Sequence, residues 1–470
     1  MLLVKSITLK KTKTLQSNCK TLLVFLTAFF MLCKFNGSAQ DNSPYSRYGL
    51  GDIVPQTNII SRGMGGVSAG YSNVVSINFQ NPASYAFFQS LKEAKSKKLA
   101  SGRVVLDLGT NFENRTLKEK TVADKFVAYN ALFSHLQLGI PLRNNWGLSF
   151  GLRPLTRISY KIDRVEMLYD PITHQPIDSA LTEYRGDGGS YLASMGTGYK
   201  FNDKLSAGFN FGYLFGKKEY HTQRAFLNDT ITYQQSNYET KTSYGNIYFN
   251  AGIQYRTQLN KQVSLTTGAY GNLSQKLNAW EDIIRETFLK DPVLGDVRLD
   301  SIFEQKNIKG KITYPASFGL GFIAEKPAET KKRGWQLGMD FTQTSWSQYR
   351  YYGATDSIRN NWQLHFGAQS MPAMNPTTKS YWNVVTYRAG FFIGSDYIKV
   401  KNKLPQFGAS FGISLPLRTS RFNPNEFNMI NLAIEYGKRG NNNNLLRENL
   451  FRVSVGFSFS DFWFVKRKYD

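Results

Sequence analysis

Residues 452–460 read Arg-Val-Ser-Val-Gly-Phe-Ser-Phe-Ser, and this stretch decides the fold. Its odd positions hold Val453, Val455, Phe457 and Phe459, whereas its even positions hold small or polar residues. Successive side chains of a β-strand point to opposite faces, so this strand has one apolar and one polar face. The stretch predicts a β-strand that lies between two different environments.

The same alternation returns along the chain, over residues 205–216, 247–255, 335–341 and 407–415. A strand of about nine to eleven residues, tilted by about 45°, crosses the apolar core of a bilayer. A soluble sandwich would bury its apolar faces. Repeated segments of this length, with aromatic residues near their ends, favour apolar faces that meet lipid and polar faces that line a wet lumen. We predict an all-β fold, a transmembrane antiparallel β-barrel.

We count fourteen strands, and an even number is typical of outer-membrane barrels. Their centres are expected near Leu106, Leu132, Leu148, Ala193, Phe209, Phe249, Thr267, Gly319, Met339, Leu364, Ala389, Phe411, Ala433 and Val455. Short connections are expected at 141–145, 201–204 and 257–262, and long loops at 161–184, 217–240 and 276–310. Short turns of such barrels face the periplasm and long loops face outward, so both ends of the mature chain are expected on the periplasmic side.

Residues 1–39 have the features of a secretory signal peptide. Lysines without any acidic residue precede an apolar run, residues 21–33, that is too short to span a bilayer as a helix. Small residues, Gly37-Ser38-Ala39, precede the expected cleavage point at Gln40, and an uncleaved anchor is the alternative. Cleavage would remove both cysteines and six lysines. It would therefore exclude disulfides and thiolate sites and lower the formal charge from +24 to +18.

The basic charge of the chain suits an exported membrane protein. An exported chain does not meet the genome, so we exclude nucleic acid as a partner. Basic residues at strand ends and in loops are expected to contact the phosphates of outer-membrane lipid and lipopolysaccharide. We predict a location in the outer membrane of a Gram-negative bacterium.

Residues 40–100 do not alternate. They contain Arg-Gly-Met-Gly-Gly-Val-Ser-Ala-Gly at 62–70, followed by Asn81-Pro82-Ala83. Glycine permits tight turns and close backbone packing, and Pro82 restricts its own φ and the conformation of Asn81. We predict that this segment folds into the lumen as a hatch, with the barrel over residues 101–470. A disordered periplasmic tail is the alternative.

The glycine-rich run and the Asn-Pro-Ala motif resemble the FadL-type family, outer-membrane transporters of long-chain fatty acids and other hydrophobic compounds. In that family such motifs form an N-terminal hatch inside a fourteen-stranded barrel. The resemblance implies a hatch motif at Gly63, Gly65, Gly66, Asn81, Pro82 and Ala83. Similar hatch signatures occur in the barrel component of the type IX secretion machinery, which handles secreted proteins. The C-terminal stretch 461–470 departs from the family by adding a charged tail after its aromatic residues.

Chemistry at a catalytic or metal site is not expected. The four histidines, His135, His174, His221 and His365, lack ligand spacing, so we predict no metal and no cofactor. Ser134 precedes His135, but strand neighbours point to opposite faces, which would keep the two side chains apart. We predict that the protein is not an enzyme.

Three further groups of residues are candidate sites. Arg452 is expected to face the lumen, where it could pair with Asp52 of the hatch. Solvation by water in the lumen would account for a charged residue at this position equally well. Lys161, Lys217 and Lys218, near the external rim, are candidates to bind an anionic head group. Aromatic residues at strand ends are expected to form an interfacial girdle: Trp146, Trp335, Trp346, Tyr351, Tyr352, Trp382 and Trp463.

The leading functional hypothesis is passive transfer of hydrophobic small molecules, such as long-chain fatty acids, across the outer membrane past a hatch. The second is a barrel that docks secretion-machinery or other protein partners through its external loops or rim. An open porin is a weaker third.

Overall fold

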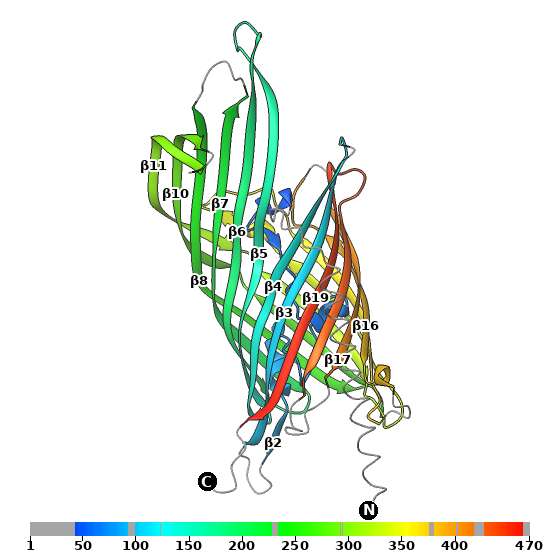
Figure 1. Cartoon of the computed structure of the whole chain (residues 1–470). Coiled ribbons are helices and arrows are strands. Elements are labelled where there is room, and N and C mark those ends of the chain that lie inside the picture. The colour runs from blue at the N-terminus through cyan, green and yellow to red at the C-terminus, as the bar shows by residue number, and fades with distance from the viewer. Residues whose placement is uncertain are drawn as a thin grey trace, which may run out of the picture. The chain divides into compact units, whose positions relative to one another are not determined.

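The computed structural model describes residues 43–92, 99–122, 124–227, 234–291, 293, 295–375, 380–400, 403–417 and 427–463. The predicted signal peptide, residues 1–39, lies outside these ranges. The described residues after the hatch form one antiparallel sheet that closes on itself (Figure 1). The prediction of an all-β barrel is confirmed.

Fourteen of the described strands form the closed barrel, and each contains one predicted centre. They are β3 (Leu99–Glu119), β4 (Lys125–Arg143), β5 (Trp146–Tyr169), β6 (Pro176–Lys200), β7 (Leu205–Phe226), β8 (Gln235–Gln258), β9 (Ser264–Asn272), β12 (Ser317–Lys326), β13 (Gly334–Thr344), β15 (Asn361–Met371), β16 (Thr386–Ser395), β17 (Pro405–Pro416), β18 (Met429–Arg439) and β19 (Leu446–Trp463). The barrel closes where β19 pairs with β3, with Val453 opposite Phe112.

The three connections predicted as long loops are instead strands. β5 and β6 continue to a short turn after Tyr169, and β7 continues to Phe226. The predicted loop 276–310 is a hairpin of β10 (Gln275–Asp291) and β11 (Gly295–Tyr314), in which β10 pairs with β8. The loop interpretation was wrong because these segments carry polar residues on both faces, which removes the apolar period that marks a strand in lipid.

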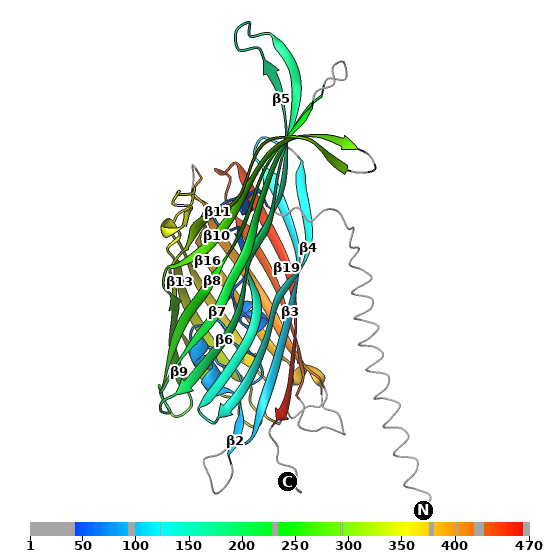
Figure 2. The same ribbon diagram turned by 90° about the vertical axis from the view of Figure 1, so that its left-hand side faces the viewer.

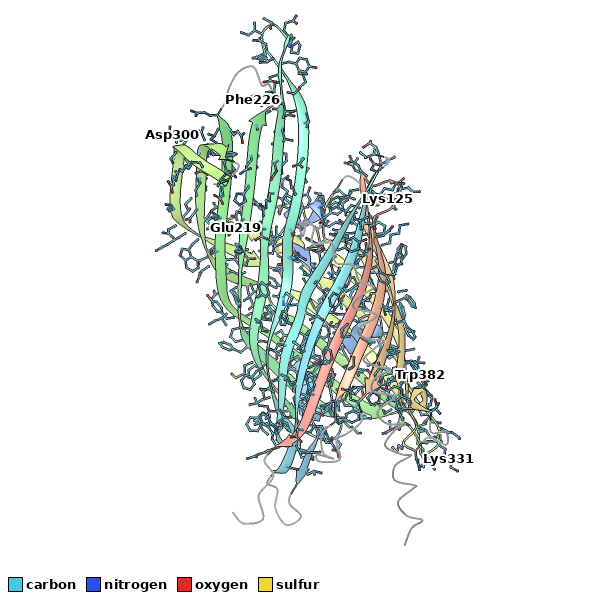
Figure 3. The ribbon with its side chains drawn as sticks, in the orientation of Figure 1. Lys125, Glu219, Phe226, Asp300, Lys331 and Trp382 are labelled. Carbon is cyan, nitrogen blue, oxygen red and sulfur yellow. The ribbon has the colours of Figure 1, made fainter. Side chains whose placement is uncertain are left out.

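These strands form a sheet that projects beyond one end of the barrel, and we call it the extension. It comprises residues 161–169, 176–187, 217–226, 235–243 and 280–309. Figures 1 and 2 show it rising past the other strands. In Figure 3, Phe226 and Asp300 lie beyond the level of Lys125, where β4 begins, whereas Lys331 and Trp382 lie at the opposite end.

The outer surface of the barrel below the extension is apolar. On β7, outward side chains alternate with buried ones: Phe209, Phe211, Tyr213 and Phe215 are 54%, 40%, 50% and 38% exposed. The outward series then changes to charge at Lys217. Among the described residues, no helix has both the length and the apolar character needed to cross a membrane.

The hatch, which we define as residues 43–92, packs inside the barrel (Figures 1 and 2). It contains η1 (Pro44–Arg47), β1 (Asp52–Ile53), α2 (Ile59–Gly63), η2 (Pro82–Phe87) and β2 (Ser90–Lys92). The helix α2 contacts β16 to β19, and η2 contacts β4 to β8. A compact segment therefore precedes the barrel and fills much of its interior.

Several strands carry glycine on their inner face, where the backbone of the hatch packs directly against the wall. A Cβ atom added to Gly390 would lie 2.2 Å from the Gly65 nitrogen, and one added to Gly268 would lie 1.9 Å from the Ala69 oxygen. Side chains at these wall positions would displace the hatch. The expected wet lumen is thus largely a packed interior.

The remaining elements are η3 (Trp346–Gln348), β14 (Arg350–Tyr351) and η4 (Tyr381–Asn383). Trp346 was predicted for the interfacial girdle, but it is only 3% exposed, and its ring lies 4.9 Å from that of Tyr397, under Gly49 of the hatch. The girdle assignment of Trp346 is wrong because η3 turns inward after β13. Trp146 and Trp463 are exposed on the short-turn end of the barrel, at the start of β5 and the end of β19.

Candidate functional site

The glycine-rich run of the hatch packs closely against the inner face of the wall at three glycines, Gly63, Gly65 and Gly66. Gly65 and Gly66 have φ of 68° and 95°, the left-handed region that favours glycine. A Cβ on Gly65 would lie 2.6 Å from the Phe366 oxygen, and one on Gly66 would lie 2.9 Å from the His365 ring. Gly63, in α2, approaches Gly412 of β17 in the same way. Both conformation and space require glycine at Gly65 and Gly66.

The Asn-Pro-Ala motif begins η2 on the other side of the lumen. The Asn81 side chain accepts a hydrogen bond from the Ala83 nitrogen at 3.1 Å, which caps the helix. The same side chain donates to the Ala69 oxygen at 2.7 Å and so ties the two halves of the hatch together. Pro82 occupies the first helical position, where it costs no hydrogen bond, and Ala83 is fully buried.

Arg62 anchors α2 to three strands. Its guanidinium donates to Asn111 of β3, Ser134 of β4 and Ser454 of β19, the last two at 2.7 and 3.1 Å. Arg62 is only 2% exposed, so these polar contacts replace its water. Sequence reasoning missed this residue, although its place inside the glycine-rich run was a signal.

The argument that kept Ser134 and His135 apart is wrong. A β-bulge shifts the β3–β4 register between Gly109 and Thr110, so that both side chains turn inward, and a hydrogen bond of 3.0 Å joins Ser134 Oγ to His135 Nδ1. Both residues are buried, and Arg62 occupies the Ser134 oxygen. The pair therefore forms part of the hatch anchorage and faces no open cleft.

Asp52 forms the main ionic link between hatch and wall. Its carboxylate lies 2.8 Å from Arg115 of β3 and 2.9 Å from Arg439 of β18. The two arginines also share Glu448 of β19, at 2.8 and 3.4 Å. Burial alone would raise the pKa of Asp52, but Arg115 and Arg439 outweigh it and hold that pKa below its ordinary value. Asp52 therefore stays ionised and ties together the strands on both sides of the closure.

Arg452 faces the lumen but does not pair with Asp52. Its partners are Glu113 of β3, at 2.7 Å, and Glu435 of β18, at 3.2 Å. Arg452 stands opposite both glutamates in the strand register, so the nearest carboxylates belong to the wall. The pairing of Arg452 with Asp52 is corrected accordingly.

The three candidate lysines have different environments. Lys218 is 6% exposed and points inward, where its ammonium donates to the Gly49 oxygen of the hatch at 2.9 Å. Lys161 and Lys217 point outward, but each already lies near an acidic residue, Glu183 at 2.8 Å and Asp187 at 3.1 Å. Lys218 thus holds the hatch, and only Lys161 and Lys217 remain accessible to an external ligand.

A cavity of about 330 Å³ lies between the hatch and the wall. Its lining includes nine charged residues, Asp52, Arg62, Arg115, Arg153, Glu435, Lys438, Arg439, Glu448 and Arg452. It also includes eight aromatic residues, Tyr248, Tyr270, Tyr314, Phe318, Trp346, Phe392, Tyr397 and Phe407. Binding sites for hydrophobic compounds are mostly apolar, with a few polar groups. The mixed lining therefore does not distinguish between a site for water and a site for an apolar ligand.

The wall has a break in strand pairing between β4 and β5. These strands pair only from Leu136–Leu152 to Arg143–Trp146, and they diverge above that point (Figure 1). The hatch strand β1 occupies part of the free β5 edge, with Asp52 opposite Arg157 and Ile53 opposite Thr156. The hatch backbone thus pairs with a part of β5 that β4 does not cover.

Among the described residues, no group of three or more His, Cys, Asp or Glu side chains could hold a metal ion. The interior contains buried ion pairs between hatch and wall, a cavity of mixed lining and a break in the pairing of the wall strands. The exterior offers an apolar band and the extension.

A family model named BamG matches residues 19–470. The chain belongs to the BamG family. A comparison with curated proteins gives no match.

Several solved structures are similar to this BamG-family chain. The CymD monoaromatic hydrocarbon channel has 15% identity and a TM-score of 0.48 over 88% of this chain and 98% of its own. A Pseudomonas aeruginosa FadL homologue has 13% identity and a TM-score of 0.49 over 89% and 100%. The Pseudomonas putida toluene transporter TodX has 15% identity and a TM-score of 0.48 over 87% and 99%. These neighbours include the FadL type that the hatch motif resembles.

The closed barrel, its apolar outer band and its family agree on a coarse description. The protein is a fourteen-stranded outer-membrane-type β-barrel of the BamG family.

Proposed function

We propose that this barrel serves as a membrane-embedded docking partner of the Bam machinery to which its family name points. The observation that carries the proposal is the extension, a sheet of six strands that continues past the apolar band. The external connections of outer-membrane barrels are commonly long loops, whereas here they form a folded sheet. A folded sheet in this position offers a rigid surface for a protein partner, and rigid surfaces bind with a smaller entropic cost.

The interior supports the same proposal. The hatch is held to the wall by buried ion pairs and backbone contacts, which favour a closed interior. In this proposal the mature termini and the short turns face the periplasm, and the extension faces outward, as in other outer-membrane barrels. The signal peptide, over residues 1–39, would deliver the chain there.

Affinity purification of the tagged full chain from native outer membranes, in mild detergent, tests the proposal. We expect other Bam machinery proteins to copurify in fixed proportion and to remain after a high-salt wash. A chain that elutes alone under both conditions, while remaining folded, would contradict it.

A second candidate is transfer of hydrophobic small molecules, such as long-chain fatty acids, and the break between β4 and β5 favours it. Ile53 of the hatch is 36% exposed at this break, so a shift of β1 would open a path between the lumen and lipid. Lys161 and Lys217 are the accessible head-group ligands in this candidate. Uptake of labelled oleate by cells with and without the gene tests it, and equal uptake would remove it.

The packed hatch weighs against the open porin. Strands of an open pore would not need glycine at wall positions such as Gly390, where a side chain would strike the hatch.

A further inference from the structure

Arg153 of β5 is a buried cation in the lining of the cavity between hatch and wall. The residue is only 5% exposed. Among the described residues, its guanidinium forms no ion pair and donates to one acceptor, the Gln56 carbonyl of the hatch, at 3.1 Å, while its Nε has no partner. A buried charge loses its hydration, and this loss is normally offset by an anionic partner.

The other arginines of the same lining have such compensation. Arg115, Arg439 and Arg452 lie 2.8, 2.9 and 2.7 Å from carboxylates of the hatch or the wall. The guanidinium of Arg62 donates to three side-chain oxygens. Within the part of the chain that the structure describes, Arg153 is thus the arginine of the cavity that lacks both an ion pair and a side-chain acceptor.

The hatch holds Arg153 in place without neutralising it. The centre of its guanidinium lies 4.6 Å from the centre of the Phe79 ring, and its other contact is the Gln56 carbonyl. An aromatic face and a carbonyl attract a cation but carry no full negative charge. The position of the guanidinium is therefore fixed before any ligand arrives.

Two tyrosine hydroxyls add neutral donors to the same cavity. Tyr248 of β8 and Tyr314 of β11 both line it, and their rings meet edge to face at 5.9 Å. Both lie close enough to Arg153 to interact with its charge. No described side chain or backbone group forms a hydrogen bond with either hydroxyl. A phenol hydroxyl can donate to an anion, so donors exceed acceptors here.

The lining beside these donors is aromatic. The Trp346 ring lies 6.5 Å from the Tyr314 ring, and Phe318 of β12 lines the same cavity. Aromatic rings pack favourably against one another in edge-to-face or offset arrangements. The surroundings of the donors therefore favour a ligand that carries a ring of its own.

Volume and charge limit the ligand further. The cavity of about 330 Å³ is at the lower end of the range for small-molecule pockets, roughly 300–1,000 Å³. One uncompensated guanidinium calls for one negative charge, and a phosphate monoester would bring a second. The tail of a long-chain fatty acid would lie against the ion pairs of Asp52 with Arg115 and Arg439, which is unfavourable for apolar groups.

We propose that the cavity beside Arg153 binds a compact aromatic carboxylate, of which benzoate is the simplest example. The carboxylate accepts paired hydrogen bonds from the planar guanidinium and further ones from Tyr248 and Tyr314. The ring packs against Tyr314, Trp346 and Phe318. The site lies inside the barrel, so the inference goes beyond the docking role of the extension and does not depend on it.

Calorimetric titration of the purified full chain, in an uncharged detergent, tests this inference. We expect benzoate to bind at least about tenfold more tightly than benzamide, which has the same ring without the charge. Acetate, which has the charge without the ring, should also bind at least about tenfold more weakly than benzoate. Equal affinity for benzoate and benzamide would overturn the inference.

Substitutions of two cations in the lining locate the site. Arg153→Met removes the charge and keeps most of the side-chain length, so the affinity for benzoate should fall at least about tenfold. Arg153→Lys keeps the charge but loses the paired donors, so its affinity should be intermediate. Lys438→Met is the matched control, because Lys438 lines the same cavity, and it should bind as the wild type does. An affinity that depends on Lys438 and not on Arg153 would contradict the assignment.

Photolabelling of the wild-type chain needs no variant and decides the question if Arg153→Met does not fold. We expect para-azidobenzoate to label peptides that contain Tyr248, Tyr314 or Trp346, and excess benzoate to suppress the label. A label confined to the outer surface, or one that benzoate leaves unchanged, would overturn the inference. Copurification of Bam proteins depends on none of these results, so the docking proposal stands or falls separately.

Discussion

At the scale of single residues, buried contacts between hatch and wall decide whether the lumen stays closed. Asp52 is the hatch carboxylate shared by Arg115 and Arg439. Asp52→Asn leaves two buried cations with less compensation, and removal of one partner of a buried ion pair costs roughly 3 kcal/mol or more. We expect faster hydrogen exchange over the hatch, with the barrel strands unchanged.

Asp203→Asn is the control for that measurement. Its exposed carboxylate pairs with Lys200 at 3.4 Å on a turn, and such surface pairs contribute about 0–1 kcal/mol. Hatch exchange should match the wild type. Equal exchange in the Asp52 variant and this control would mean that Asp52 does not hold the hatch.

A substitution at Gly65 can separate the free-energy cost of a strained backbone conformation from the cost of steric overlap with the wall. Gly65→Ala places a methyl group 2.6 Å from the Phe366 oxygen, at a φ of 68°. Gly353→Ala has a φ of 85° with nothing within 4 Å of its Cβ, so it bears only the conformational cost of about 1 kcal/mol. We expect Gly65→Ala to lower the free energy of unfolding by clearly more than Gly353→Ala. An equal decrease in the free energy of unfolding in both variants would show that the wall strands move to accommodate the added methyl group at Gly65.

At the scale of elements, the sequence predicts strands where lipid imposes a period and misses them elsewhere. Strands such as β7 have an apolar outer face that alternates with a buried inner one, and each predicted centre falls in one of the fourteen barrel strands. β10, β11 and the distal parts of β5 to β8 carry polar residues on both faces, so no continuous apolar period marks them. The hatch was recognisable from its glycine run and Asn-Pro-Ala motif. Its partners in the wall were not, because the bulge at Ser134 and the register around Arg452 exist only in three dimensions.

An element that stands outside the membrane should be removable without loss of the barrel. We expect the variant with residues 165–181 replaced by Asn-Gly to insert and to unfold in urea at the wild-type midpoint. The apolar band and the hatch contacts all lie below the deletion. Replacement of η2 residues 82–87 by a Gly-Ser linker of equal length is the contrast, since these residues pack on β4 to β8. A midpoint that falls equally in both variants would refute the division between extension and barrel.

At the scale of the whole molecule, the hatch makes a barrel of pore-forming size into a closed body. Fourteen strands enclose room for more than side chains, and here that room is filled by hatch backbone that meets wall glycines at Gly268 and Gly390. Deletion of residues 43–88 removes this filling and leaves a cluster of charged side chains on the adjacent strands β18, β19 and β3, around Arg439, Arg452 and Arg115.

We expect the intact chain to give little steady current in a planar bilayer and the deleted chain to give open channels. Cations line the vacated interior alongside their glutamates, so the channels should be wet and conduct ions. The conductance of the Asp52→Asn chain should be intermediate between those of the intact and the deleted chain, with brief openings, because fewer ion pairs hold its hatch. Steady conductance by the intact chain would show that ions pass the hatch in its native position. The conclusion that the hatch closes the barrel would then be wrong.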